Sequence, residues 1–438
     1  MKSQSAVTGQ NSTNDIQFHI LSFEGPDGYA RAGGIASRIT GLSEALVQTG
    51  FETHLWFVGD PELSGHENRG RLSLHRWCQW ISQYHPAGVY DGEEGKRADY
   101  AASLPPFLLH EVLLPHLQRG GRAVVLAEEW HTVDAVVHLD WLLRNARVRD
   151  KVTLFWNANN VFSFDRIAWD RLSAAAVITT VSRFMKYQLW ERGVNPLVIP
   201  NGLTAAAFAP PDREAVAALR SRVRNRILLS KVARWDPDKR WLLAIDTVRV
   251  LKNLGWRPLL IARGGIEEHG AEVLARAKAA GLRVTERSGL VKGVRDLLQA
   301  LEGIGDADIV HLRTPLDAES CRLLFRGSAA VLANSGREPF GLVGLETMAA
   351  GGVACTGSTG EDYVIPGKNA LVLETTDPWE FVALFRELSA DPLRDRALRR
   401  AGRATAEQFS WQNIVKRLLL PRLHPLVEAS STEKLRPA

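Results

Sequence analysis

Glu338 and Glu346 enclose the segment whose residue types and spacing point most strongly to chemistry. Between them stands Pro-Phe-Gly-Leu-Val-Gly-Leu, directly after an apolar run that predicts a strand. A strand, a turn of small residues and then a helix leave the amides of Gly341, Leu342 and Val343 unpaired at the helix N-terminus. These amides and the helix dipole favour an anion. Without the turn, the two glutamates would indicate only an acidic cap and a surface side chain.

The two glutamates occupy different places relative to this helix. Glu346 falls about two turns into it, where a carboxylate can accept hydrogen bonds from ribose hydroxyls. Glu338 precedes the helix, where it can contact a sugar. The segment therefore predicts a site for a sugar linked to an anionic group.

Two cations, Arg234 and Lys239, follow another predicted strand at residues 227–230. A loop at the carboxyl end of a strand is where open α/β sheets bind ligands. Fixed cations there stabilise a diphosphate leaving group more in the transition state than in the ground state. The alternative is a surface loop in which these cations pair with Asp236 or Asp238. The presence of the Glu338 segment in the same chain favours the functional interpretation.

Two further segments carry weaker signals. Gly33 and Gly34 lead into a predicted helix, and glycine lets a backbone approach a phosphate closely. The alternative is a simple turn. His131 follows a predicted strand in the run Glu-Glu-Trp-His-Thr, where it can bond a sugar hydroxyl or move a proton. The alternative is a structural histidine whose hydrogen bonds are satisfied.

Composition restricts the class of protein. The chain has 438 residues, 45% hydrophobic and 24% charged, enough for two or three globular domains. The charge of +5 is dispersed and accompanies no nucleic-acid-binding signature, so we expect no nucleic acid partner. No apolar run reaches the ~18 residues of a membrane helix, and the polar start indicates no secretory signal. We expect a cytoplasmic protein, with a peripheral contact at the inner membrane surface left open.

Other chemistries lack their motifs. There is no Walker A loop and no full G-x-G-x-x-G, which argues against an ATPase or a dehydrogenase. The three cysteines are widely spaced, and no His/Cys/carboxylate cluster has metal spacing. Two Asp-x-Asp triplets, at 236–238 and 306–308, are interpreted as loop chemistry and a strand start. We therefore predict no metal and no cofactor.

Short β-rich runs alternate with helical patterns along most of the chain. We expect strands at 17–23, 53–58, 123–127, 152–156, 176–181, 227–230, 259–262, 309–312, 329–333 and 370–373. This alternation predicts parallel sheets with right-handed crossovers, and it restarts after Pro200-Asn201-Gly202. The expected fold is α/β, with two Rossmann-like, doubly wound domains. We predict a tail at 1–15, a first domain at 16–200, a second at 201–405, a closing helix at 406–425 that packs back on the first domain, and a tail at 426–438.

The aromatic-rich stretch 75–109 departs from the alternation. Its tryptophan and tyrosine side chains could stack on sugar rings in an acceptor site. The other interpretation is a packed insertion that covers the first sheet.

From about residue 23 to residue 411 the chain resembles the retaining GT-B glycosyltransferases of family 4. Glu338 and Glu346 match the E-x7-E motif of that family, and Arg234 and Lys239 match its Arg-x4-Lys clamp. Gly33-Gly34 is similar to its N-terminal glycine loop. The run Glu129-Trp130-His131-Thr132 is similar to the Asp-Trp-His-Thr of bacterial glycogen synthases.

The resemblance implies two domains facing across a cleft and an enzyme that transfers a sugar from a nucleotide-diphosphate donor, retaining anomeric configuration without a metal. The acceptor would be a carbohydrate or glycolipid on the first domain. Glu338, Arg234, Lys239 and His131 would be catalytic. The expected donor-binding residues are Gly33, Gly34, Arg234, Lys239, Phe340, Gly341, Leu342, Val343 and Glu346, and the expected acceptor residues are Glu129, Trp130 and Asn157.

The chain also departs from the family. Where glycogen synthases carry Thr-Val-His-Asn, this sequence reads Leu-Phe-Trp-Asn-Ala-Asn from Leu154, so Asn157 and Asn159 are the candidate substitutes for the missing histidine. Two alternatives follow. One is an epimerase or hydrolase of sugar nucleotides on the same fold. The other is a protein that binds sugar nucleotides without catalysis. The sequence makes no prediction of oligomeric state.

Overall fold

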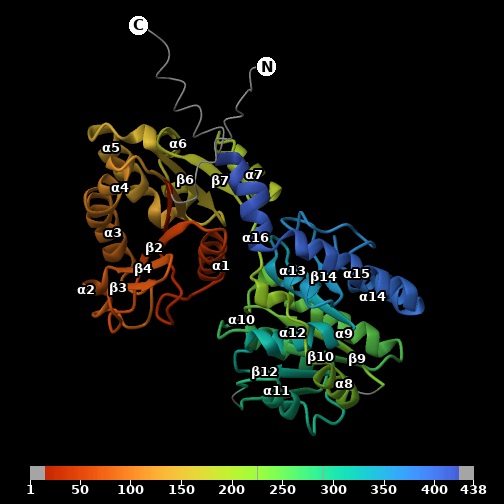
Figure 1. Ribbon diagram of the computed structural model, residues 1–438. Coiled ribbons are helices and arrows are strands. Elements are labelled where there is room, and N and C mark those ends of the chain that lie inside the picture. Colours follow the sequence, from red (N-terminus) through yellow and green to blue (C-terminus); the bar gives the residue numbers. More distant parts are fainter. Residues whose placement is uncertain (1–14, 224, 290, 424–438) are drawn as a thin grey trace, which may run out of the picture. The chain divides into compact units, whose positions relative to one another are not determined.

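A computed structural model describes residues 15–423 except 224 and 290, and these residues form two compact units. The first unit contains the chain up to Gly202 and the segment from Trp411 onward. The second contains Leu203–Ser410. Each unit is described by itself below (Figure 1). The predicted tails at 1–15 and 426–438 lie outside the described residues, apart from Asp15.

The first unit is built on an eight-stranded sheet in the order β3-β4-β2-β1-β5-β6-β7-β8. All neighbouring pairs are parallel except β3 with β4, which is antiparallel. The chain moves outward from β1 in one direction through β2 and in the other through β5, so the strand order reverses between β1 and β5. The strands are β1 Ile16–Leu21, β2 Glu52–Val58, β3 His66–Arg69, β4 Leu72–Trp77, β5 Arg122–Glu128, β6 Val152–Ala158, β7 Val177–Thr180 and β8 Leu197–Val198.

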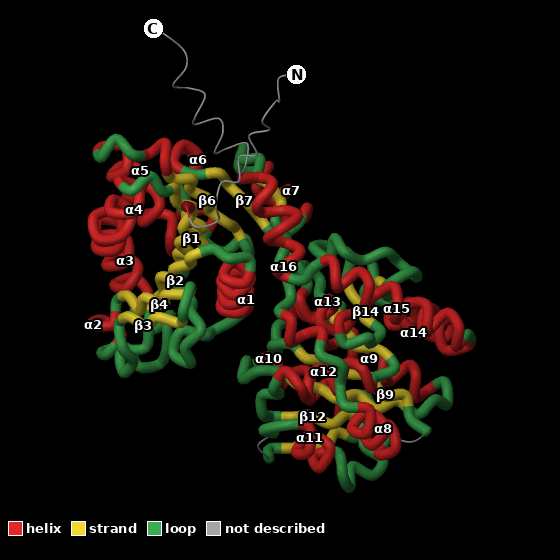
Figure 2. Tube along the Cα trace, viewed as in Figure 1, coloured by secondary structure: helices red, strands yellow, loops and turns green. Residues whose placement is uncertain are grey.

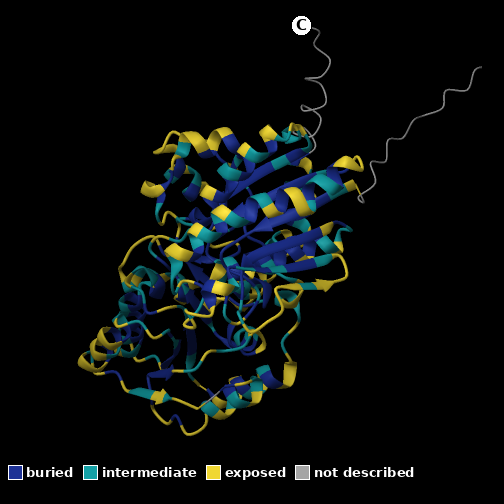
Figure 3. Ribbon diagram, turned by 90° about the vertical axis from the view of Figure 1, so that its left-hand side faces the viewer, coloured by how far each residue is buried: buried dark blue, intermediate teal, exposed yellow. Residues whose placement is uncertain are grey.

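The central strands of this sheet are buried on both faces, as the largely apolar strands of a parallel sheet are. β1 reads Ile-Gln-Phe-His-Ile-Leu and is buried from its second residue onward, and β5 and β6 are similar. Figure 3 shows these strands as dark, buried ribbons. The principal helices of the unit are α1 Gly34–Gln48, α2 Gln79–Ser82, α3 Glu93–Phe107, α4 Leu114–Gln118, α5 Val133–Asn145, α6 Trp169–Ala175, α7 Arg183–Trp190 and α16 Trp411–Ile414.

The second unit has a seven-stranded, all-parallel sheet in the order β11-β12-β10-β9-β13-β14-β15. Its strand order reverses between β9 and β13. The strands are β9 Ile227–Val232, β10 Pro258–Arg263, β11 Val284–Arg287, β12 Ile309–Leu312, β13 Ala330–Ala333, β14 Ala354–Thr356 and β15 Leu371–Val372. The helices are α8 Arg213–Arg222, α9 Trp241–Asn253, α10 His269–Ala279, α11 Val294–Ala300, α12 Ala318–Gly327, α13 Leu342–Ala349, α14 Pro378–Ala390 and α15 Pro392–Gln408. Figure 2 shows helices on both faces of the sheet.

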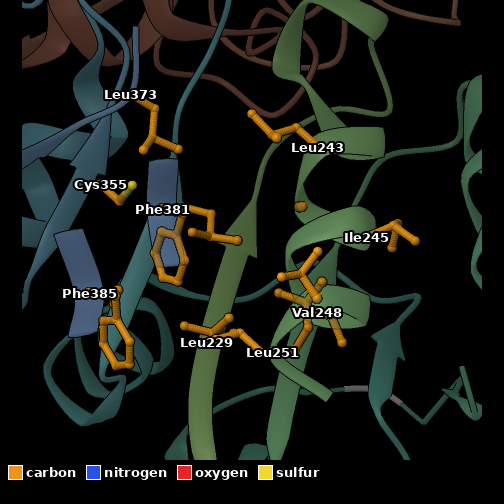
Figure 4. Close-up of a cluster of buried hydrophobic side chains, with 14 of the residues drawn as sticks. Leu229, Leu243, Ile245, Val248, Leu251, Cys355, Leu373, Phe381 and Phe385 are labelled. Atoms are coloured by element: carbon orange, nitrogen blue, oxygen red, sulfur yellow. The ribbon is translucent and has the colours of Figure 1, made fainter. Parts of the chain in front are cut away.

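A core under α9 and α14 holds the second unit together. Val248 and Leu251 of α9 face Leu229 of β9, and Phe381 and Phe385 of α14 stack beside them with ring centroids 5.3 Å apart (Figure 4). These side chains recur at the three-to-four-residue interval of an amphipathic helix. The same packing fixes β9, whose carboxyl end carries Arg234 and Lys239.

The sequence prediction of two doubly wound α/β domains is confirmed. Every strand expected from an apolar run is present within one or two residues of its expected bounds. The prediction was wrong to omit β3, β4, β8, β11 and β14. These strands are short, polar or at a sheet edge, and β3 reads His-Glu-Asn-Arg with no buried residue. Every helix among the described residues is too short or too polar to cross a bilayer.

A buried ion pair joins distant segments of the first unit. Arg38 of α1 donates through Nε to both carboxylate oxygens of Glu128 at 3.0 Å, and through Nη1 to Asn201 Oδ1 at 2.7 Å. Asn159 Nδ2 donates to Glu128 Oε2 at 2.8 Å. The guanidinium also lies over the Trp411 ring, 5.4 Å from its centroid. Arg38 thus connects α1, the end of β5, the chain where it leaves this unit, and the segment that returns to it.

We expect Arg38→Met to lower the free energy of unfolding by about 3–5 kcal/mol, because Glu128 would remain buried without its counter-charge. Urea denaturation followed by tryptophan fluorescence measures the loss. The double variant Arg38→Met/Glu128→Gln removes both charges and should recover much of it. A single variant as stable as the wild type would contradict this account.

Candidate functional site

The predicted cations and the Glu338 segment lie at the point where strand order reverses in the second sheet. Arg234 and Lys239 follow β9, and Glu338 follows β13, its neighbour in the sheet. Both strands run parallel, so their carboxyl ends share one edge. A reversal of strand order opens a crevice at that edge, because the connections from the two strands leave toward opposite sides.

The loop after β9 is held in place by aromatic packing. Trp235 is buried, and its ring centroid lies 4.0 Å from that of Trp241. The Trp241 Nε1 group donates to the Arg234 carbonyl at 2.7 Å. Arg234 itself is 70% exposed and only loosely paired with Asp236 at 3.9 Å. The backbone of the loop is therefore fixed while the Arg234 guanidinium stays available to a ligand.

Lys239 and Glu338 form the central contact of the site. Lys239 Nζ donates to Glu338 Oε2 at 2.6 Å, and both side chains are about one-fifth exposed. Two backbone bonds hold their loops together: the Gly336 amide donates to the Asp238 carbonyl at 2.7 Å, and the Arg337 amide donates to Asp238 Oδ1 at 2.9 Å. Residues 99 positions apart in the sequence are thus joined by one ion pair.

The helix after Glu338 begins as the sequence predicts. α13 starts at Leu342 and continues through Val343, and no side chain in the described part of the chain caps its N-terminus. Gly341 precedes it with φ +79°, and a Cβ there would come within 2.6 Å of Glu361 Cγ, so only glycine fits. The Phe340 side chain is buried beneath this turn. The first amides of α13 are therefore presented without a side-chain cap, as an anion site requires.

Two further carboxylates lie near this turn. Glu346 is half-buried on α13, and burial raises its pKa to about 7. Glu361 is buried, its pKa is raised to about 7 chiefly by burial, and its Oε1 makes no hydrogen bond among the described residues. The Thr359 amide donates to the other oxygen of Glu361 at 3.1 Å, and Thr359 Oγ1 accepts from the Glu338 amide at 2.8 Å. Glu338, Glu346 and Glu361 thus place three carboxylates around the start of α13.

A buried lysine lies below this edge of the sheet, and no sequence pattern predicted its role there. Lys231 of β9 is 1% exposed and donates to the Leu332 carbonyl at 2.8 Å and to Asn334 Oδ1 at 3.0 Å. Burial lowers its pKa to about 7. It ties β9 to the end of β13, the two strands that carry the ion pair.

In the first unit, the amide of Gly33 is already in use. Glu24, which follows β1, accepts from the Gly33 amide at 2.9 Å and from the Ala36 amide at 3.0 Å through one oxygen. Tyr90 donates to its other oxygen at 2.7 Å. Glu24 thus satisfies the start of α1, next to Gly34. Glu24 could not be predicted as a cap, because no sequence pattern links a carboxylate to a helix start that lies nine residues further along the chain.

His131 lies close to this carboxylate. Its ring stacks on Phe23 with centroids 4.5 Å apart and lies 5.4 Å from that of Tyr90. His131 Nε2 is 2.6 Å from Glu93 Oε1, while Nδ1 is buried without a partner among the described residues. Burial lowers the pKa of His131, although Glu93 acts in the opposite direction. The ring is therefore both anchored and, at one nitrogen, unsatisfied.

The three predicted acceptor residues occupy different environments. Glu129 is buried at φ +67°, and burial raises its pKa to about 8. Trp130 is buried, with the Arg166 guanidinium 4.5 Å from its ring centroid. Asn157 donates to Glu128 at 3.0 Å and accepts from Thr179 at 2.9 Å. Asn157 therefore contacts the Arg38–Glu128 network in the interior of the unit.

The structure thus gathers the predicted residues into two groups. Arg234, Lys239, Glu338, Phe340–Val343 and Glu346 meet at one edge of the second sheet. Gly33, Gly34 and His131 meet at the carboxyl edge of the first sheet, between β1 and β5, with Glu24, Tyr90 and Glu93 added by the structure.

One family model and several curated relatives match this chain. Residues 296–405, which contain the Glu338 segment, match the family model described as glycosyl transferases group 1. A D-inositol 3-phosphate glycosyltransferase from Thermobispora bispora is 31% identical over 430 residues, which cover 93% of each chain. Those from Geodermatophilus obscurus and Streptomyces avermitilis are 27% and 29% identical over 51% and 50% of this chain. The chain spans about half the length of these two relatives, 46% and 45%.

Solved structures show the same fold. The catalytic domain of starch synthase IV from Arabidopsis thaliana, bound to ADP and acarbose, superposes with a TM-score of 0.67 at 14% identity, covering 95% of this chain and 99% of that one. Sucrose-phosphate synthase from Thermosynechococcus elongatus gives 0.63 at 19% identity, covering 94% and 100%. Both likenesses concern the GT-B fold. The relative aligned along nearly the whole chain, together with the family match, shows that this chain belongs to the group 1 glycosyltransferases.

Proposed function

We propose that this glycosyltransferase moves a sugar from a nucleotide-diphosphate donor to a hydroxyl of a carbohydrate or glycolipid acceptor, with retention of anomeric configuration and without a metal or cofactor. The observation that carries the proposal is the Lys239–Glu338 pair at 2.6 Å, beside the uncapped start of α13. It places a cation, a carboxylate and helix amides at the one edge of the sheet suited to a ligand.

The pair suggests how the donor diphosphate binds. A carboxylate oxygen on Lys239 occupies a position that a phosphate oxygen can take, since both are anionic acceptors. On donor binding, Lys239 would exchange Glu338 for the diphosphate, and Arg234 and the α13 amides would complete its surroundings. Glu338, released from the lysine, would then accept hydrogen bonds from the transferred sugar. Glu346 would accept from the ribose.

The chemical step follows from these positions. The bond between the sugar anomeric carbon and the phosphate oxygen breaks, and its electron pair stays on the diphosphate. Lys239 and Arg234 stabilise this added charge as it develops on the phosphate oxygens. The acceptor oxygen bonds to the anomeric carbon from the face that the diphosphate leaves, and its proton passes to a phosphate oxygen. This same-face course is what retention requires.

The acceptor is proposed to bind at the carboxyl edge of the first sheet. His131, whose Nδ1 is unsatisfied, and the Glu24–Tyr90 pair are groups that bond hydroxyls. We retain Glu129 and Trp130 as acceptor-side candidates and assign Asn157 instead to positioning Glu128. The names of the curated relatives add a specific candidate, D-inositol 3-phosphate, which is a phosphorylated polyol.

The function is tested by incubating the chain with UDP-, ADP- and GDP-glucose and D-inositol 3-phosphate or a sugar acceptor. We expect nucleoside diphosphate release that depends on the acceptor and, by proton NMR, a product with the α configuration of the donor. Release without acceptor would favour a hydrolase. A β-linked product would contradict retention.

We expect Lys239→Ala to lower kcat about 10²–10³-fold while raising the donor KM much less, because the lysine meets charge that grows in the transition state. Steady-state kinetics with the active donor measure the split. Lys278→Ala, an exposed lysine of α10, is the matched control. A change confined to KM would show that Lys239 only binds the ground state.

Donor affinity should depend on pH through Glu346. With a pKa near 7 in the free protein, its carboxylate is ionised above pH 7 and protonated below. Ribose hydroxyls are held better by the ionised acceptor, so affinity should fall as pH drops from about 8 to 6, by up to about tenfold per unit below the pKa. A nucleotide sugar is the proper ligand, because its diphosphate does not titrate in this range.

Two variants separate the carboxylates that titrate near pH 7. Glu346→Gln should flatten the pH dependence measured by calorimetry, while Glu361→Gln should preserve it. The opposite result would transfer the ribose role away from Glu346.

A further inference from the structure

A large groove in the second unit lies away from the Lys239–Glu338 site. Its volume is about 1240 Å³, and it runs between α8 and α15, past the ends of α12 and α13. Among the residues that the structure describes, its charged lining consists of seven arginines and one glutamate. This concentration contrasts with the dispersed charge expected from the sequence.

The arginines come from facing walls. Arg213 and Arg220 of α8 are seven residues apart and therefore share a face of that helix. Arg396, Arg400 and Arg403 of α15 follow at intervals of four and three, again on one face. An anion in the groove would thus be contacted from two sides.

Part of the cluster has a structural role. Arg326, at the end of α12, donates to the Gly351 carbonyl at 2.7 Å, and Arg399 donates to the same carbonyl at 3.3 Å. Arg403 donates to the Ala349 carbonyl at 2.5 Å. These bonds satisfy carbonyls at the C-terminal end of α13, which cations favour. Arg399 also pairs with Asp395, and Arg403 with Glu407, at 3.0 and 3.5 Å.

The other four arginines have no such role. Arg213, Arg220, Arg396 and Arg400 are exposed, and within the described chain none of them makes a hydrogen bond or an ion pair. Helix capping therefore accounts for three of the seven charges and leaves four unexplained.

The cluster also repels itself. The pKa of Arg326 is lowered first by burial and then by the charges of Arg399, Arg220 and Arg403. An anion bound between these guanidinium groups would offset the repulsion among like charges that the helices hold close together. Guanidinium groups suit phosphate in particular, because their planar fork can donate two parallel hydrogen bonds to it.

We propose that this groove is a second ligand site, which binds a soluble anion carrying two or more phosphate groups. Its concave form distinguishes this ligand from a membrane, whose phosphates lie in a surface that would meet only the rim. The guanidiniums of Arg326 and Arg399, which are partly buried at the end of α13, can be reached only by a ligand that enters the groove.

Calorimetric titration of the whole chain with sodium tripolyphosphate tests the proposal. We expect binding that weakens as NaCl is raised and falls at least tenfold in Arg396→Ala/Arg400→Ala, two residues with no contact to lose. The matched control is Arg386→Ala/Arg394→Ala, exposed arginines of α14 and α15 outside the groove, which should bind as the wild type does. Lys239→Ala separates the groove from the donor site and should also retain binding.

Three results would overturn the proposal: binding lost in Lys239→Ala but kept in Arg396→Ala/Arg400→Ala, an equal loss in the control pair, or no binding of tripolyphosphate. Co-sedimentation with phosphatidylglycerol vesicles forms a second arm. Binding to these vesicles that needs Arg396 and Arg400, without binding to tripolyphosphate, would assign the groove to a membrane instead.

Discussion

The reversal of strand order at the centre of each sheet is the constraint on which the rest of the structure depends. In the second unit it lies between β9 and β13, and in the first between β1 and β5. The chain segments that leave the two strands at a reversal run to opposite sides of the sheet, so the carboxyl ends of these two strands stay uncovered. Elsewhere along the same edge, connecting segments cross over the strand ends. Almost every residue that the sequence predicted to take part in binding or catalysis follows one of these four strands.

The charges at the second reversal are largely offset within the site itself. Lys239 lies on Glu338, which neutralises both groups, and burial holds the pKa of Glu346 and Glu361 near 7, so part of their charge is removed by protons. Carboxylates that can accept hydrogen bonds from hydroxyls and a cation that can bind a phosphate therefore lie close together. A ligand that carries hydroxyls and a diphosphate together satisfies all of them, whereas a simple anion would leave the carboxylates opposed to it.

Some strands and site residues could be predicted from the sequence and others could not, and the difference has physical reasons. Buried parallel strands are continuous apolar runs, so β1, β5, β9 and β12 could be found, while edge strands such as β3 carry no burial signal. Glu338 and Glu346 stood in a motif with its own turn, and Gly341 adopts the positive φ that the turn needs. Their positions could therefore be derived.

Pairings across the fold could not be derived in this way. Asn157 looked available because it ends a strand, yet both ends of its amide are used by Glu128 and Thr179. Gly33 looked open to a phosphate, yet Glu24 accepts from its amide. The groove arginines are scattered over 190 positions between Arg213 and Arg403, and only the packing of α8 beside α12 and of α13 beside α15 gathers them. Each depends on which residues meet in space, which a local pattern does not encode.

The central claim is that a nucleoside diphosphate binds at the reversal between β9 and β13. Isothermal titration of the chain with UDP, ADP and GDP tests it most directly. The account predicts one nucleotide that binds clearly more tightly than the others, at one site per chain, with affinity strongly reduced in Arg234→Ala/Lys239→Ala. Failure of all three to bind, or binding unaffected by that double variant, would contradict it.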